Sequence, residues 1–320
     1  MSKKNLQPIE NSKELELSIK RFKHSVDYAV VCNVTRGVYS KSSELAIASD
    51  WNRFALFCSK YNVTPLPASF TAVRLFLEKE SSIRKFSSIK RYSVSIGVVH
   101  KVHGFRDPGT NKQLRLVIKQ LELEKNGDAR QANAFTNEHL SQLDNLMKRD
   151  NSPQAYRDLA IYYLMFECAL KRSELRYLEL ESVKFDHGQA VVSVGDNRYA
   201  LSGNASNALC RWLDLLPGKG ICFRRIDKHG NIGEDALDDS SIYRVMRRAS
   251  DKLGLSEEMR FTAQSPRVGA ARALKLQGHD LKGIQEFGRW LSPAMPAQYL
   301  NFQSTSDTEK SKFKTIRPWI

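Results

Sequence analysis

Apolar residues recur every three or four positions along much of the first 126 residues. Residues 64–67 ("TPLP") and 107–109 ("DPG") interrupt this pattern with helix breakers. The spacing places apolar side chains on one face of a helix. It predicts helices at 42–62, 70–80, 87–104 and 111–125. Together they predict an all-helical bundle over residues 41–126.

Polar stretches flank this predicted bundle. Residues 1–40 are polar and weakly patterned, which predicts a flexible N-terminal arm. The polar segment "NGDARQANA" at 126–134 predicts a linker over 127–134. A second domain would then occupy 135–320.

The second domain combines helical and strand patterns. Three- and four-residue spacing predicts helices at 137–148, 155–171, 204–214, 239–254, 265–277, 281–287 and about 293–304. The segments "QAVVSV" and "RYALS" flank the turn residues Gly195, Asp196 and Asn197, which predicts a β-hairpin. The fold class is therefore mainly α, with two domains and a small antiparallel sheet.

The charge of the chain points to an anionic partner. The net charge is +15, and residues 1–130 hold 23 Lys and Arg against 12 Asp and Glu. Ten basic residues but only two acidic ones lie between 51 and 106. A charge run is often only a solvated face, but this excess favours a surface that follows nucleic-acid phosphates. The candidate contacts are Arg53, Lys60, Arg84, Lys85, Lys90, Arg91, Lys101 and Arg106.

Other functional classes find little support in the sequence. The five cysteines form no CxxC pair, and no HExxH, GxxxxGK[ST] or GxGxxG motif occurs. We expect no metal, no small-molecule cofactor and no disulfide, and we expect His100 and His103 to be exposed or to contact a nucleic-acid backbone. The N-terminus lacks a signal-peptide pattern, and no long apolar run predicts a membrane span. A cytoplasmic protein is therefore expected, with coating of an anionic membrane as the minor alternative.

One stretch, "QSPRVGAAR" at 264–272, predicts an anion site at the start of a helix. Ser265 is expected to cap the helix, and Pro266 suits its first turn because the missing N–H is not needed there. Arg267 would lie beside the free N–H groups of that turn, where anions bind.

An ordered set of motifs then identifies a family resemblance. "ALKRSELRYLEL" at 169–180 is followed by the hairpin with a basic residue after its turn, and then by "QSPRVGAARALKLQGHDLKGIQEFGRW" at 264–290. Tyr299 lies nine residues after Trp290. In order and spacing the chain resembles the tyrosine recombinases (phage integrase family), and within them the Cre type, over most of residues 43–304. The resemblance implies a two-domain DNA clamp, with a helical core-binding (SAM-like) domain and a catalytic domain.

The resemblance also implies a chemistry and its residues. A tyrosine attacks a DNA phosphodiester and forms a 3′-phosphotyrosine, which a 5′-hydroxyl of another strand later displaces. Tyr299 matches this nucleophile, Arg267 the second arginine and Trp290 the aromatic donor to the phosphate. Glu174 matches the acidic residue that braces the site.

Three positions depart from the family pattern. Lys171 stands at the first arginine of the RxxEL box and lacks the bidentate fork of a guanidinium. Its neighbour Arg172 would point about 100° round the helix. Arg198 stands at the hairpin lysine, which acts as general acid, and Gln264 stands at a histidine.

These departures leave two functions open. The first is site-specific DNA recombination or integration on an inverted-repeat site, by a homodimer per site and a tetrameric synapse or with a partner recombinase. The second is a catalytically impaired homologue that acts as a DNA-binding regulator or accessory factor. Either fits a nucleoid-associated protein of a prokaryote, phage, plasmid or mobile element. The tail "SDTEKSKFKTIRPWI" follows the tyrosine helix, and Trp319 would anchor it on a neighbouring protomer or on its own domain.

Overall fold

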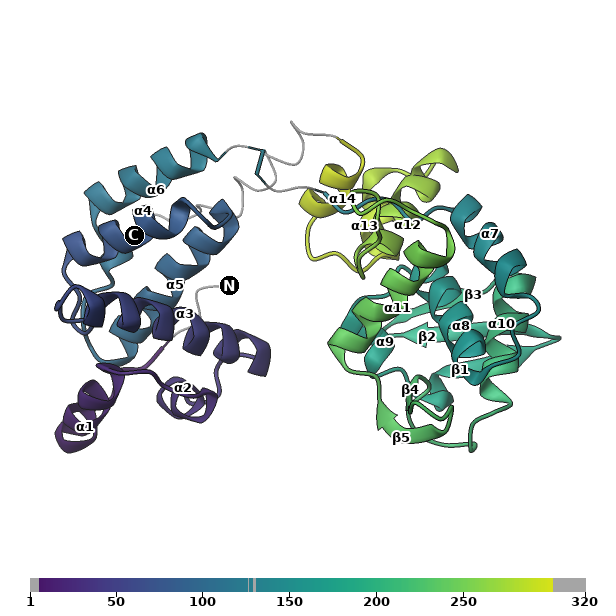
Figure 1. Cartoon of the computed structure of the whole chain (residues 1–320), viewed down its shortest axis with the longest axis horizontal. Coiled ribbons are helices and arrows are strands. Elements are labelled where there is room, and N and C mark those ends of the chain that lie inside the picture. The colour runs from purple at the N-terminus through teal and green to yellow at the C-terminus, as the bar shows by residue number, and fades with distance from the viewer. Residues whose placement is uncertain (1–5, 126, 129–130, 302–320) are drawn as a thin grey trace. The chain divides into compact units, whose positions relative to one another are not determined.

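The computed structural model describes residues 6–125, 127–128 and 131–301. The chain forms two compact units, residues 1–130 and residues 131–320 (Figure 1). Residue 126, the linker residues 129 and 130, and the tail with Trp319 lie outside the described residues. Among the described residues, no helix is long and apolar enough to cross a membrane.

The N-terminal unit is the helical bundle that the periodicity predicts. Its elements are α1 (Ser12–Phe22), α2 (Tyr28–Thr35), α3 (Lys41–Lys60), α4 (Phe70–Ser81), α5 (Phe86–Val102), the 3-10 turn η1 (Pro108–Thr110) and α6 (Lys112–Glu124). Side chains of Ser40, Ser69 and Asn111 cap α3, α4 and α6 by accepting backbone N–H groups. The core gathers Trp51 and Phe54 of α3 with Phe76 of α4.

The flexible arm predicted over residues 1–40 is not what the structure shows for residues 12–35. These residues form α1 and α2, and Phe22 and Val31 are buried in the core of the unit. The indole of Trp51 donates to the Phe22 carbonyl (3.1 Å), and the Asn52 amide bonds both backbone groups of Val26. Val30 of α2 is buried in the same core, so both helices are part of the folded unit.

His100 and His103 are buried, so the expected exposure or nucleic-acid contact is wrong. Each is 1% exposed and donates from Nδ1 to a carbonyl one turn earlier, Ile96 and Val99 respectively. His100 Nε2 accepts from the Ala68 N–H (2.9 Å), and His103 Nε2 hydrogen-bonds the Ser18 hydroxyl (2.8 Å). Both rings therefore join elements of the bundle.

The C-terminal unit is helical with two small antiparallel sheets. Its helices are α7 (Asn137–Met147), α8 (Pro153–Glu167), α9 (Arg172–Arg176), the 3-10 turn η2 (Leu180–Ser182), α10 (Gly203–Leu213), α11 (Asp239–Lys252), α12 (Ser265–Leu276), α13 (Leu281–Phe287) and α14 (Ala294–Tyr299). The strands are β1 (Val183–Asp186), β2 (Gln189–Val194), β3 (Asn197–Ala200), β4 (Arg224–Ile226) and β5 (Ile232–Ala236). The predicted hairpin is β2–β3, and β1 extends it to a sheet of order β1-β2-β3.

The core of this unit forms around α8. Residues 159–166 of α8 are all buried, and α10 and α12 pack against this helix (Figure 1). Helix α12 lies close to the segment before α7: a Cβ on Gly269 would lie 1.6 Å from the Phe135 carbonyl oxygen. This contact fixes the start of α12, which carries Gln264 and Arg267, against the core.

Candidate active site

The loop that follows α8 presents Lys171 and Glu174. Lys171 precedes α9 with an extended backbone (φ −75°, ψ 155°), and its N–H donates to Glu174 Oε2 (2.7 Å). Its ammonium donates to Glu174 Oε1 (3.0 Å), while the side chain remains 44% exposed. Lys171 is therefore tied to the carboxylate and still open to a ligand.

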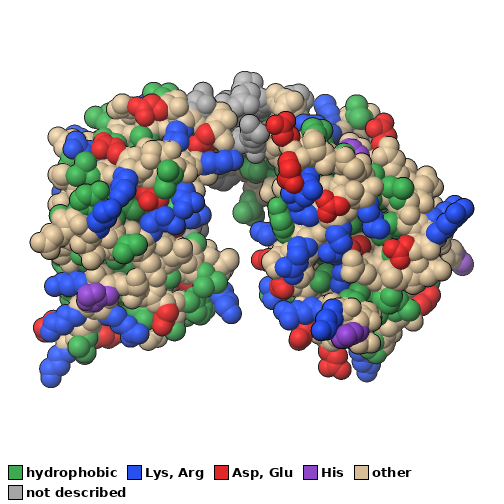
Figure 2. Space-filling model, in the orientation of Figure 1, with side chains coloured by type: hydrophobic (Ala, Val, Ile, Leu, Met, Phe, Trp, Pro, Cys, Tyr) green, Lys and Arg blue, Asp and Glu red, His purple; other side chains and the backbone are tan. Residues whose placement is uncertain are grey.

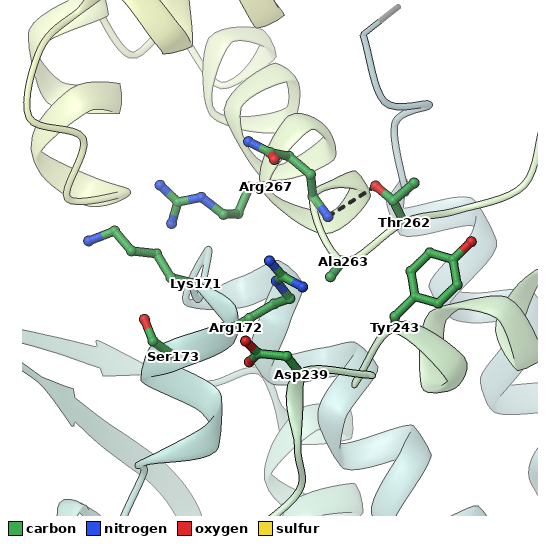
Figure 3. Close-up of a pocket in the computed structure, with 9 residues that line it drawn as sticks. Lys171, Arg172, Ser173, Asp239, Tyr243, Thr262, Ala263 and Arg267 are labelled. Atoms are coloured by element: carbon green, nitrogen blue, oxygen red, sulfur yellow. Dashed lines mark hydrogen bonds between the residues drawn. The ribbon is translucent and has the colours of Figure 1, made fainter. Parts of the chain in front are cut away.

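A pocket of about 460 Å³ opens beside this loop (Figure 3). It is lined by Lys171, Arg172, Ser173, Asp239, Tyr243, Thr262, Ala263, Gln264 and Arg267. Three cations against one carboxylate, with hydroxyl and amide groups between them, suit an anion such as a phosphate.

Arg172 faces this pocket as Lys171 does, which corrects the expectation that it points elsewhere. The close-up shows both side chains projecting into the space beneath Arg267. The 100° rotation applies between two helical residues. Lys171 lies before the helix with extended backbone, so that rule does not hold for this pair.

Arg267 lies in the first turn of α12 and is only 6% exposed. Its guanidinium donates to the carbonyls of Ala169 and Gly288 and stacks on Trp290, with Cζ 4.3 Å from the ring centroid. Burial lowers its pKa to about 10, so it remains charged at neutral pH. The expected cap is wrong, because the Ser265 hydroxyl accepts from the Thr262 N–H before the helix instead of capping it.

Trp290 connects Arg267 with Tyr299. Its ring meets the Tyr299 ring edge-on, with centroids 5.9 Å apart. A Cβ on Gly288 would lie 1.9 Å from the Trp290 ring, so only glycine lets the indole occupy this position. The stack of Arg267, Trp290 and Tyr299 therefore depends on the turn after α13.

Tyr299 is the last residue of α14 and is 3% exposed. Its hydroxyl accepts a hydrogen bond from the Gln264 amide. Its carbonyl accepts from Gln131 Nε2 and Arg272 Nε, both at 3.2 Å. These contacts hold the end of α14 against the start of α12.

The structure does not bring Arg198 to this pocket. It lies exposed on β3 opposite Ser193 and is absent from the residues that line the pocket. The hairpin itself is attached nearby, because Asn197 Nδ2 donates to the Glu286 carbonyl (3.1 Å) at the end of α13.

Arg289 is a site residue that the sequence reasoning missed. It donates through Nε to Glu174 Oε1 (3.1 Å) and through Nη2 to Oε2 (2.7 Å). Burial alone would raise the pKa of Glu174, but hydrogen bonds from Arg289 and Lys171 lower it to about 2. A signal was present in the "GRW" turn at 288–290, which is similar to the "GGW" turn of the Cre type.

The predicted DNA contacts of the N-terminal unit divide into two groups. Four of them pair with acids: Arg53 and Arg84 with Glu80, Arg91 with Asp50, and Lys101 with Asp107. For the other four no ion pair occurs within the described part of the chain: Lys60, Lys85, Lys90 and Arg106. On the face shown in Figure 2, basic side chains are interleaved with hydrophobic and acidic ones.

Metal-ligating side chains do not gather elsewhere in the part of the chain that the structure describes. Residues 6–125, 127–128 and 131–301 contain no group of three or more His, Cys, Asp or Glu that could hold an ion. The five cysteines are free thiols.

Comparison with known proteins places these features in a family. A sequence model of the phage integrase family matches residues 135–305, more than half of the chain. An integrase/recombinase XerD homologue of Selenomonas ruminantium is 24% identical, over 91% of this chain and 87% of that protein. The recombinase Cre of Escherichia phage P1 is 22% identical, over 83% of this chain and 85% of that protein.

Solved structures share the fold. The XerH site-specific recombinase bound to its palindromic difH substrate superposes with a TM-score of 0.61 at 15% identity, over 95% of this chain and 90% of that one. A lambda integrase dimer bound to a COC′ core site gives 0.56 at 13% identity, over 89% and 94%. The mainly helical fold with small antiparallel sheets is thus confirmed. The chain belongs to the phage integrase family, the tyrosine recombinases.

Proposed function

We propose that this protein recombines DNA at a specific site by strand cleavage through Tyr299. The observation that carries the proposal is that the same residues contact Tyr299 and the cationic pocket. Gln264 lines the pocket and donates to the Tyr299 hydroxyl, and Trp290 contacts both Tyr299 and Arg267. The nucleophile would therefore lie next to the phosphate that the pocket holds.

The proposed reaction exchanges one phosphodiester for another. The Tyr299 oxygen bonds the phosphorus and loses its proton to solvent, while the bond from phosphorus to the 5′-oxygen breaks and that oxygen takes up a proton. Lys171, Arg172 and Arg267 would stabilise the charge on the non-bridging oxygens. The phosphotyrosine ester conserves the energy of the broken phosphodiester bond. A 5′-hydroxyl of another strand can therefore reverse the step.

The partner of this reaction would be double-stranded DNA with an inverted-repeat site. The solved relatives named above are bound to palindromic or core-site DNA, and one is a dimer on it. We propose the same mode for this protein, with a dimer on each site and two sites in a tetrameric synapse, or with a partner recombinase in place of one subunit.

A suicide duplex tests the proposed cleavage. Random-sequence DNA selected for binding to the full chain supplies the site. A nick just 3′ of the cleavage position lets the short fragment that carries the released 5′-hydroxyl diffuse away. We expect a covalent, heat-stable protein–DNA adduct that Tyr299→Phe abolishes. An adduct that persists in Tyr299→Phe would contradict the proposal.

A second function is favoured by the three exchanged positions. Lys171 lacks a fork, Arg198 is a poor proton donor and Gln264 does not titrate. A chain with this site could bind DNA as a regulator or accessory factor without cutting it. No adduct from the natural protein, together with adduct from the Lys171→Arg, Arg198→Lys variant, would establish this alternative.

A further inference from the structure

Arg289 occupies a backbone position that favours glycine. It follows Gly288 in the turn after α13, and its φ of 54° lies in the left-handed region. The side chain is nevertheless 86% buried, since its exposed fraction is 14%. A residue kept there against its backbone preference must gain contacts that glycine lacks.

The Arg289 guanidinium uses each of its nitrogens in the site. Nε and Nη2 grip the two oxygens of Glu174 in a parallel fork, at 3.1 and 2.7 Å. Nη2 also donates to the Cys168 carbonyl (3.1 Å). Nη1 donates to the Phe287 carbonyl (3.1 Å) and to the Tyr199 hydroxyl of β3. The fork therefore joins the loop after α8, the turn after α13 and the hairpin.

The Lys171 side chain holds the same carboxylate less firmly than Arg289 does. A single ammonium bond reaches Glu174 Oε1 at 3.0 Å, from a flexible stem that is 44% exposed. A bidentate guanidinium fixes a carboxylate in orientation, whereas an ammonium acts as a point charge. Of the two cations, only Lys171 lines the pocket.

We propose that Arg289 is a positioning residue that holds Glu174 with the fork that a lysine at position 171 lacks, so that the Lys171 ammonium can leave Glu174 Oε1 for the DNA phosphate while the carboxylate stays in place. This inference rests on the proposed function. Two residues then perform the roles that one arginine at position 171 would combine. Arg289 orients Glu174 from inside the protein, and Lys171 binds the phosphate in the pocket.

The same fork also supports Arg267. The Ala169 carbonyl accepts from both guanidiniums, with Arg289 Nη2 at 3.3 Å. The Gly288 carbonyl, in the turn that Arg289 anchors, accepts from Arg267 Nη2 at 2.8 Å. Arg289 thereby holds the backbone that positions the second cation of the pocket.

The titration of Glu174 tests the fork without DNA and without activity. Carboxyl NMR of the full chain should show Glu174 with a pKa of about 2 in the natural protein. We expect Arg289→Gly to raise this pKa toward the ordinary value of about 4.3. Lys171→Met should raise it less, because the Lys171 N–H still donates to the carboxylate. An unchanged pKa in Arg289→Gly, or a larger rise in Lys171→Met, would overturn the proposal.

Covalent capture on the suicide duplex tests the consequence for the site. At saturating DNA we expect Arg289→Gly to slow adduct formation by about 10²-fold. We expect Arg289→Lys to restore little, because it lacks the fork, and Lys171→Arg with Arg289→Gly to return to within about tenfold of the natural rate. A double variant no faster than Arg289→Gly would overturn the exchange of roles.

Two controls separate this role from general stability. His187→Gly relieves a similar backbone position (φ 46°) in the exposed turn between β1 and β2, and should leave the capture rate unchanged. Rates are compared well below each variant's melting temperature. If the natural protein forms no adduct, the proposed cleavage fails, and the Glu174 titration alone decides the role of Arg289.

Discussion

The leaving 5′-oxygen is the point at which the proposed chemistry is weakest. That oxygen needs a proton as its bond to phosphorus breaks, and a guanidinium with a pKa above about 12 gives one up reluctantly. Arg198 stands where the resembling family has a lysine, and it lies exposed on β3, outside the pocket. We therefore expect protonation of the leaving group to limit the rate of this protein.

The variant Arg198→Lys tests this limit. With DNA bound and the β2–β3 hairpin carried to the leaving oxygen, capture on the suicide duplex should become at least about tenfold faster, since general acid catalysis contributes roughly 10²–10⁴-fold. A duplex with sulfur in place of the 5′-oxygen should be cleaved equally fast by both proteins, because a thiolate leaves without a proton. An equal gain on both duplexes would show that the introduced lysine acts on binding and not as an acid.

At the residue scale, the structure brings together four of the side chains that the resemblance implied, Gln264, Arg267, Trp290 and Tyr299, and leaves Arg198 outside the pocket. The fork of Arg289 was missed because a turn residue belongs to no periodic pattern. Its partners lie 115 and 90 residues away in the sequence, at Glu174 and Tyr199.

At the scale of elements, helix periodicity and breakers located α3 to α8 and α10 to α13 within a few residues. The strands β1, β4 and β5 escaped prediction because they are short and mostly exposed, which leaves no clear alternation of apolar and polar residues. Helices α1 and α2 were not predicted, although the apolar side chains of Phe22, Val30 and Val31 are buried in the core of the unit.

The packing of α12 against the segment before α7 depends on Gly269. A Cβ there would lie 1.6 Å from the Phe135 carbonyl oxygen, so Gly269→Ala must push α12 away from the segment before α7. We expect a loss of roughly 1–3 kcal/mol in the free energy of unfolding, and slower adduct formation. Urea unfolding measures the first. Gly203→Ala, in the first turn of α10 with open space around it, is the matched control and should not destabilise.

The buried histidines at the C-terminal end of α5 predict a pH dependence of the N-terminal unit. Burial lowers the pKa of His100 and His103, whereas an unfolded histidine titrates near 6.5. The unfolded chain then binds more protons, so the free energy of unfolding falls as pH drops below about 6.5. Urea unfolding at pH 7.5 and 5.5 should show up to roughly 1.4 kcal/mol per pH unit for each histidine. The fall in the free energy of unfolding between the two pH values should be smaller in the double variant His100→Gln, His103→Gln. An equal fall in that variant would contradict the role of these histidines.

At the scale of the whole molecule, positive charge is concentrated in the N-terminal unit, but its cations are not equivalent. Arg91 forms a fork with Asp50, a carboxylate that is 1% exposed, with both bonds at 2.9 Å. Lys85 and Lys90 are exposed, and no ion pair holds them within the residues that the structure describes. Arg91 therefore stabilises the fold, whereas Lys85 and Lys90 are available to bind DNA phosphates.

DNA affinity at several salt concentrations separates these roles. Lys85→Gln with Lys90→Gln should lower the slope of log affinity against log salt by about 0.9 for each lysine in phosphate contact. Arg91→Gln should leave that slope nearly unchanged and lower the stability of the unit, because the buried Asp50 carboxylate loses its cationic partner. A slope unaffected by the two lysine substitutions would remove them from the DNA-binding surface.

The most direct test of strand cleavage through Tyr299 is to locate the DNA on the protein. The adduct from the suicide duplex is digested with protease and nuclease, and the nucleotide-bearing peptide is sequenced by mass spectrometry. We predict a 3′-phosphate ester on Tyr299, in the peptide that follows Arg289. An ester on any other residue, or a natural protein that binds the selected site but never forms the ester, would contradict this prediction.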